Sequence, residues 1–200
     1  MGVVLPQLRL GYIRGVRGAV VQTLNADGTN AAPIVRFGIR TAQQVSVETV
    51  SEGGEDSRLR GGDRVLARVK DPDTIVGVNL TLQNARFDAR AIQLIAGGTL
   101  ITVVEGPDTR IIGWEAPTIA AQQNPPWVRI EVYAVNHNAV GGIDQFLMYT
   151  FRYCRGSFGN ETLQDQNWVI PELNIECMEN PQGGGVYRKE FVAVLPAELI

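Results

Sequence analysis

The chain has 200 residues, of which 44% are apolar and 20% are charged, and its formal net charge is −3. This composition is ordinary for one folded domain and argues against a largely disordered chain. The net negative charge argues against a protein that clamps nucleic acid, because such proteins are usually basic. No window reaches the roughly 18 unbroken apolar residues of a membrane-spanning helix, so we expect no membrane partner.

The N-terminal stretch is basic. Residues 1–44 carry five arginines and one aspartate, a charge of +4 that leaves −7 on the rest of the chain. Such asymmetry is typical either of an arm that meets an acidic neighbour or of a solvated basic face. We assign residues 1–32 to an N-terminal arm. Pro6 and Arg9 interrupt the first apolar run, so we expect no secretory signal.

Alternation of polar and apolar residues dominates the middle of the chain. In the run TIVGVNLTLQ (74–83), Asn79 and Thr81 lie on the face opposite Leu80 and Leu82. This period of two predicts a half-buried antiparallel strand. The same pattern marks residues 45–50, 64–69, 127–135, 147–154 and 172–177.

One segment breaks this rule and predicts a helix over residues 84–96. Asn84 or Asp88 can cap its start, and Gly97-Gly98 ends it. Its apolar residues recur at helical intervals: Phe87, Ala91, Leu94 and Ile95. The fold class is therefore mainly β, an antiparallel β-sandwich or part-barrel with one flanking α-helix. The C-terminal segment 180–200 opens on a glycine hinge and stays unassigned.

Catalytic and ligand-binding patterns are weak. His137 is the only histidine, no nucleophile motif accompanies it, and one histidine with two distant cysteines falls short of a zinc site. Cys154 and Cys177 fall in separate strands, and two reduced thiols are favoured over a disulfide. We expect no catalytic residue, no metal and no cofactor, and hence no enzyme, although carboxylate pairs leave a hydrolase as a distant alternative.

The run SEGGEDSRLRGG (51–62) is too long for a simple hairpin turn. Its acidic residues precede its basic residues, which favours a projecting hairpin with one acidic and one basic limb. Such a hairpin would set the register of a contact with another protein surface, with Leu59 as the apolar anchor. A solvated mobile loop is the alternative. The interface residues we expect are Glu52, Glu55, Asp56, Arg58, Leu59 and Arg60.

From this run onward, RVLARVKDPDTIVGVNLTLQNARFDARAIQLIAGGTL resembles the major tail tube proteins of tailed bacteriophages. The later WEAP (114–117), YTFRYC and IPELNIE stretches agree with that family in their order. The resemblance covers about residues 33–180 and is one of element order rather than of a catalytic signature.

The resemblance implies a structural subunit that forms stacked hexameric rings around a channel for DNA, with residues 51–62 as a stacking loop. It implies a virion tail assembled in the host cytoplasm. Double-stranded DNA would pass without specific binding. The protein partners that it implies are copies of the chain itself, a tape measure protein, tail tip or baseplate proteins and a terminator protein.

The channel wall should carry no basic track, because Lys and Arg bind phosphates. Asn79, Thr81 and Gln83 are candidate lumen-facing residues, or else they face outer solvent. Two alternatives to a phage tail tube stay open. One is the inner tube of a contractile tail-like bacteriocin or injection particle. The other is a monomeric β-sandwich that binds carbohydrate, whose stacking candidates would be Trp114, Trp127 and Trp168.

Overall fold

The computed structural model describes residues 11–61, 64–106, 108–122 and 124–200, and the structural statements below refer to these residues. The strands are β1 (Tyr12–Leu24), β2 (Arg36–Ile39), β3 (Ala42–Glu52), β4 (Asp56–Gly61), β5 (Arg64–Lys70), β6 (Thr74–Asn84), β7 (Thr99–Glu105), β8 (Asp108–Glu115), β9 (Trp127–His137), β10 (Ile143–Phe158), β11 (Glu172–Cys177) and β12 (Tyr187–Val192). The helices are α1 (Ala89–Ala96), the short α2 (Ile119–Gln122) and the 3₁₀ helix η1 (Ala197–Leu199).

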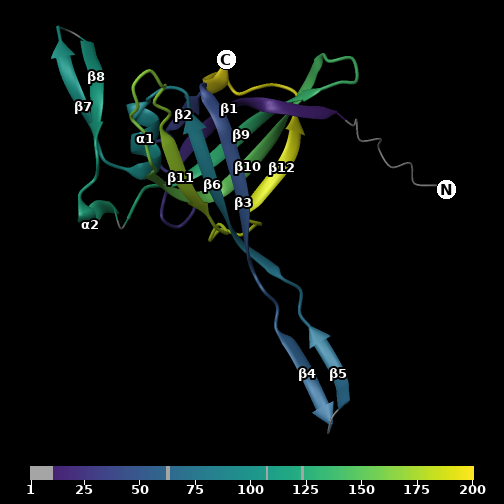
Figure 1. The fold of residues 1–200 in the computed structure, drawn as a ribbon. Helices are drawn as coiled ribbons and strands as arrows, with labels where there is room; N and C mark the ends of the chain where they lie inside the picture. Colours follow the sequence, from purple (N-terminus) through teal and green to yellow (C-terminus); the bar gives the residue numbers. More distant parts are fainter. Residues whose placement is uncertain (1–10, 62–63, 107, 123) are drawn as a thin grey trace.

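One antiparallel sheet forms the body, in the order β2-β1-β9-β10-β11-β6-β3 (Figure 1). The long β10 pairs with β12 along its first half and with β11 along its second half. The sheet curls until β1 contacts β3, although the two lie far apart in the strand order. The predicted mainly β, antiparallel fold with one flanking helix is confirmed.

The core lies inside this curl, where α1 covers it. Asp88 caps α1 by accepting hydrogen bonds from the backbone N–H groups of Arg90 and Ala91, and Gly97 ends the helix. Ile92 and Ile95 are buried against the sheet. The side chain of Asn84, the alternative cap, instead hydrogen-bonds Thr41 at the end of β6.

The helix is therefore shorter than the predicted 84–96. Residues 84–88 leave β6 and lead into the cap, and Phe87 is 49% exposed rather than part of the apolar stripe. The cap decides the start, because Asp88 satisfies two of the first N–H groups of α1.

Both ends of the chain differ from the expected arm and unassigned tail. Residues 12–24 of the expected N-terminal arm form β1, which lies between β2 and β9, with Ala19, Val20 and Val21 buried. Residues 1–10 of that arm lie outside the described residues. Within 180–200, β12 joins the sheet and η1 buries Leu199 against Val20. The middle of β1 is covered on both faces, since Ala19 and Val21 lie in the main core and Val20 packs with Leu199.

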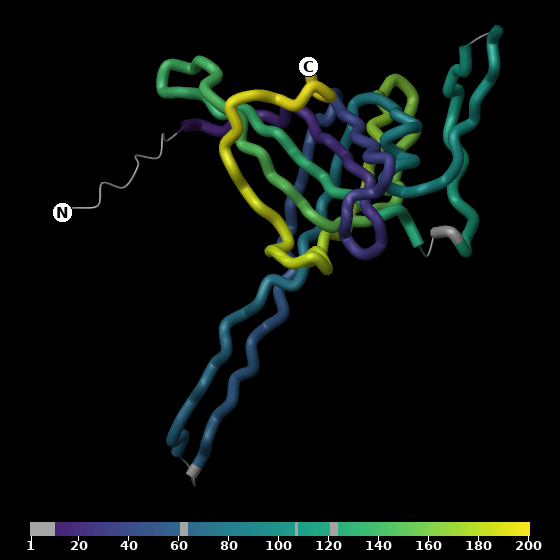
Figure 2. Tube along the Cα trace, turned by 180° about the vertical axis from the view of Figure 1, so that it is seen from behind, coloured from purple at the N-terminus to yellow at the C-terminus, as the bar shows by residue number. Residues whose placement is uncertain are grey.

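Two ribbons project from the body (Figures 1 and 2). We call residues 53–73, which carry β4 and β5, the finger, and β7 with β8 the second hairpin. The finger leaves one end of the body, and the second hairpin points toward the other end in both views. All described residues of β5 are exposed, so the prediction of a half-buried strand at 64–69 was wrong in its burial: no second layer covers this ribbon. The second hairpin was not predicted.

Candidate assembly surface

The finger is a two-stranded ribbon that pairs with no other strand in the part of the chain that the structure describes. Leu59 lies opposite Ala67, and Val69 shares their face, while a register shift after Leu59 places Val65 opposite Arg60. The exposed fractions are 62% for Leu59, 52% for Val65 and 63% for Val69. A lone two-stranded ribbon is marginal in water, so this apolar face is suited to burial against another surface.

The predicted interface residues all lie on the finger or at its base, but their charges are arranged differently from the expected limbs. Glu52 ends β3 and Glu55 precedes β4, so the acids gather at the base. Arg60 lies farther out, next to Val65 of the other strand. The finger has an acidic base and a basic outer part rather than an acidic and a basic limb.

Asp56 holds two arginines of the finger together. Its carboxylate accepts hydrogen bonds from Arg58 at 2.7 Å and from Arg68 at 2.9 Å, and these two arginines are cross-strand partners. The hydrogen bond from Arg58, followed by that from Arg68, lowers the pKa of Asp56 below its ordinary value. The carboxylate thus removes the repulsion between two like charges placed directly opposite each other.

The candidate lumen residues lie on one face of β6, and this face continues over the two neighbouring strands. Asn79, Thr81 and Gln83 alternate along β6 with the buried Val78, Leu80 and Leu82, which confirms the predicted two faces of this strand. Register pairs extend the polar face over β3 and β11. The face consists of Gln44, Ser46, Glu48, Asn79, Thr81, Gln83, Glu172, Asn174 and Glu176.

This nine-residue polar face contains three glutamates and no lysine or arginine. Side-chain hydrogen bonds link its strands: Gln83 donates to Glu172 at 3.2 Å, and Thr81 donates to Asn174 at 3.5 Å. Arg155 of β10 borders the face through its ion pair with Glu176 at 3.5 Å. A DNA phosphate would find acceptors and negative charge along these strands.

The strand β3 ends the sheet order beside this polar face. Its only hydrogen-bonded strand partner among the described residues is β6, so its outer edge is unpaired, although β1 contacts part of β3. Open edges of this length are pairing surfaces for another chain. The same strand continues into the finger, so the edge, the polar face and the finger form one continuous region.

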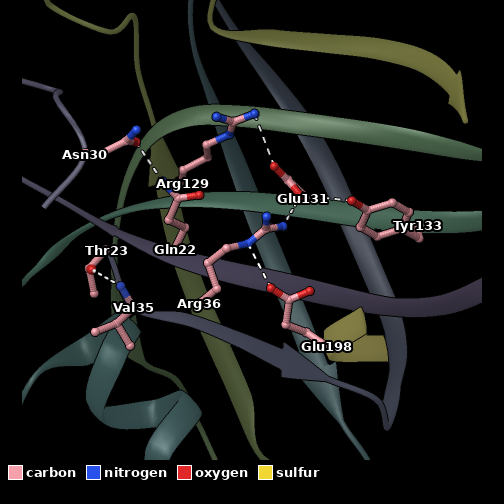
Figure 3. Close-up of polar contacts among 9 residues, drawn as sticks. All are labelled: Gln22, Thr23, Asn30, Val35, Arg36, Arg129, Glu131, Tyr133 and Glu198. Atoms are coloured by element: carbon pink, nitrogen blue, oxygen red, sulfur yellow. Dashed lines mark hydrogen bonds and ion pairs between the residues drawn. The ribbon is translucent and has the colours of Figure 1, made fainter. Parts of the chain in front are cut away.

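The face of β9 that points away from the main core carries a buried ionic network, which also includes Arg36 of β2 (Figure 3). Glu131 accepts from Arg36 at 3.2 Å, from Arg129 at 3.1 Å and from the Tyr133 hydroxyl at 2.9 Å. Arg36 also pairs with Glu198 at 3.1 Å, which fixes η1 to the sheet. Burial and the hydrogen bond to Glu131 raise the pKa of Tyr133 above its ordinary value. The network is structural, because it joins the C-terminal turn to β2 and β9.

The residues considered for chemistry or ligand stacking are scattered. His137 ends β9 and is half-buried, with Nδ1 3.1 Å from the carbonyl oxygen of Gly141 in the turn that follows. Trp114 donates to the Gly97 carbonyl oxygen and packs on Phe158. Within the described ranges, no group of three or more His, Cys, Asp or Glu side chains could hold a metal.

The other two tryptophans do not join Trp114. Trp127 stacks on Tyr153 at 3.8 Å, and Trp168 is 93% exposed in the loop before β11. Cys154 and Cys177 are buried free thiols, and they are cross-strand partners, a proximity that the sequence did not indicate. Burial raises the pKa of the Cys154 thiol. No described helix has the length and apolar character needed to cross a membrane.

Comparisons with known proteins give a weak structural likeness. No family model matches the chain, and no curated protein matches it. It is similar to a chain of the cryo-EM structure of the anti-feeding prophage baseplate, symmetrised six-fold, with 12% identity and a TM-score of 0.34. The alignment covers 97% of this chain and 100% of that one. A likeness at this level assigns neither a family nor a function.

Proposed function

We propose that this chain is a structural subunit of a phage tail tube or a related tail-like tube. In this proposal copies form hexameric rings that stack head to tail around a channel for DNA. The chain is not an enzyme and takes no cofactor in this proposal. Its partners are other copies, a tape measure protein, tail tip or baseplate proteins and a terminator protein.

The observation that carries the proposal is the nine-residue polar face of β3, β6 and β11, which has no basic residue. Binding of DNA to proteins is driven by Lys and Arg through counterion release, so a wall without them lets a duplex slide. The face also lies beside the unpaired edge of β3. Pairing at that edge would extend the polar face into the next copy and remove an exposed strand edge.

The dimensions of such a channel suit a duplex. Four strands from each of six copies make a barrel of about 24 strands, and strands about 4.8 Å apart tilted by about 45° give a circumference of about 160 Å. The backbone diameter is then about 50 Å, and side chains leave a channel of about 40 Å. Six copies carry a net charge of −18 per ring, which disfavours retention of DNA.

The finger fits the stacking contact between rings. Its exposed apolar face and its outer arginines need a covering surface, and its position at one end of the body directs it along the stack. Contacts between unlike surfaces produce closed rings around an axis and open filaments along it.

The first test is negative-stain electron microscopy of the concentrated pure protein, which should show rings or tubes with a central hole. Compact single particles at every concentration would contradict the proposal. The second test is the double variant R58E/R60E, which should stay folded by circular dichroism but assemble poorly. The matched control is R86E/R90E, which makes the same charge change at exposed positions around the start of α1. Normal tubes from R58E/R60E would refute the role of the finger.

A further inference from the structure

Three arginines from three strands line a pocket of about 340 Å³ on the face of the sheet that carries Arg36 and Glu131. They are Arg129 of β9, Arg152 of β10 and Arg188 of β12, and we call this the arginine pocket. The arginines are far apart in sequence, and strand register brings them to one face. Glu190 is the only carboxylate among the lining residues.

The charges in the arginine pocket are only partly compensated. Arg188 pairs with Glu190, and one terminal nitrogen of Arg129 pairs with Glu131. The Nε of Arg129 is buried and has no hydrogen-bond partner in the described structure. Arg152 makes no ion pair with any described residue. A buried unpaired donor beside an uncompensated guanidinium favours a carboxylate, which accepts two N–H groups at once.

The walls of the pocket are held in place before any ligand arrives. Asn180 donates to the Gly28 carbonyl oxygen at 3.2 Å, and Gln182 donates to the Asp27 carbonyl oxygen at 2.9 Å. These bonds tie the loop after β11 to the loop after β1. A Cβ at Gly184 would overlap the guanidinium of Arg152, so glycine there leaves room for that side chain. A pre-formed site loses less entropy when it binds.

Carboxylates of suitable geometry lie at the other end of the same molecule. Glu105 and Asp108 are cross-strand partners at the outer end of the second hairpin, and both are exposed. Neither makes an ion pair within the described residues. Two like charges directly opposite each other are unfavourable unless a cation lies nearby.

The two features face opposite ways along the body. The loop after β11, which lines the arginine pocket, lies at the end where the finger leaves, while the second hairpin points toward the opposite end in both views (Figures 1 and 2). In a head-to-tail stack, the outer end of the hairpin of one copy points toward the finger end of the next. We propose that the arginine pocket binds the Glu105 and Asp108 carboxylates of a second copy. This inference rests on the proposed function and adds a second contact along the stack, beside the finger.

Charge exchange between the two surfaces tests the contact. The measurement is the critical concentration for assembly, obtained by sedimentation of the full chain, with circular dichroism to confirm folding. The variants R152E and E105K/D108K should each raise the critical concentration about tenfold or more, because like charges then face each other. The critical concentration of the combined variant R152E/E105K/D108K should return to within about threefold of wild type, because the charges are exchanged between the two surfaces and attract each other again.

The matched control is E161K/D165K, which places the same charge change on the exposed loop before β11 and should leave assembly unchanged. If wild-type chains form tubes while the single-surface variants assemble normally, the pocket contact is refuted and the tube proposal stands. Folded single-surface variants that assemble poorly without rescue in the combined variant also refute it. If wild-type chains stay monomeric at every concentration, both proposals fail.

Discussion

The buried carboxylate of Glu131 should be the most costly acidic side chain to neutralise. It accepts from Arg36, Arg129 and Tyr133, and its side chain is only 10% exposed. In Glu131→Gln the amide N–H group would face a guanidinium, so one donor opposes another. The substitution also leaves two arginines without their shared counter-charge.

Removing one partner of a buried ion pair costs about 3–5 kcal/mol. The two arginines are 36% and 38% exposed, so solvent screening reduces the expected loss to about 2 kcal/mol of unfolding free energy. For a chain of this size that loss lowers Tm by about 4–8 °C. Because Arg36 also pairs with Glu198, the C-terminal turn should become more accessible to protease.

Thermal and urea unfolding followed by circular dichroism measures this loss. The matched control is Glu176→Gln, which removes a carboxylate that is 66% exposed and 3.5 Å from Arg155. Exposed pairs contribute about 0–1 kcal/mol, so the control should stay close to wild type. Equal losses in the two variants would refute the argument that burial makes the Glu131 network strong.

Three further substitutions test local features. Gly38→Ala should cost about 1–3 kcal/mol in urea unfolding, because the new Cβ would overlap the backbone oxygen of Glu198; a stability equal to wild type would show that η1 can move aside. In the wild type, stability should fall above about pH 10, because the raised pKa keeps the Tyr133 phenol neutral in the folded chain while the unfolded tyrosine ionises. Tyr133→Phe should make this fall smaller. Urea midpoints measured above about pH 10 check the prediction, and an equal fall in wild type and variant would contradict it. Asp88→Ala should cost about 1 kcal/mol and Asp88→Asn much less, because only the first removes the cap acceptor of α1; equal thermal shifts would contradict the capping role.

The sequence predicted the strands well where one face is buried. Along β6, the alternation of Leu80 and Leu82 with Asn79 and Thr81 gave both the strand and its two faces. Alternation of polar and apolar residues shows which residues share one face of a strand. It does not show whether another layer of the protein covers that face. This is why the finger strand with Val65 and Val69 was expected to be half-buried and is exposed.

Other elements could not be predicted, because the sequence carries no regular alternation or motif for them. In β1 the pairing with β9 shifts register between Arg14 and Val16 and again between Val16 and Gly18, so a strict alternation is absent. The arginine pocket could not be predicted either, because its residues come from three strands whose register is set by the whole sheet. The acidic base of the finger was missed because the sequence does not show where the hairpin turns: β4 continues to Gly61, so the acids and the arginines follow one another along one limb.

Both projecting ribbons carry exposed apolar side chains, in addition to those on the loops and chain ends of the body. Leu59 and Val69 on the finger and Val104 and Ile112 on the second hairpin are each more than half exposed. A monomer gains nothing from such ribbons, since each is marginal alone and offers a surface for aggregation. Their cost is offset only if another surface buries them. We therefore expect fast amide exchange in both ribbons of the free chain and slow exchange after assembly, while β6 and β9 are protected in both states.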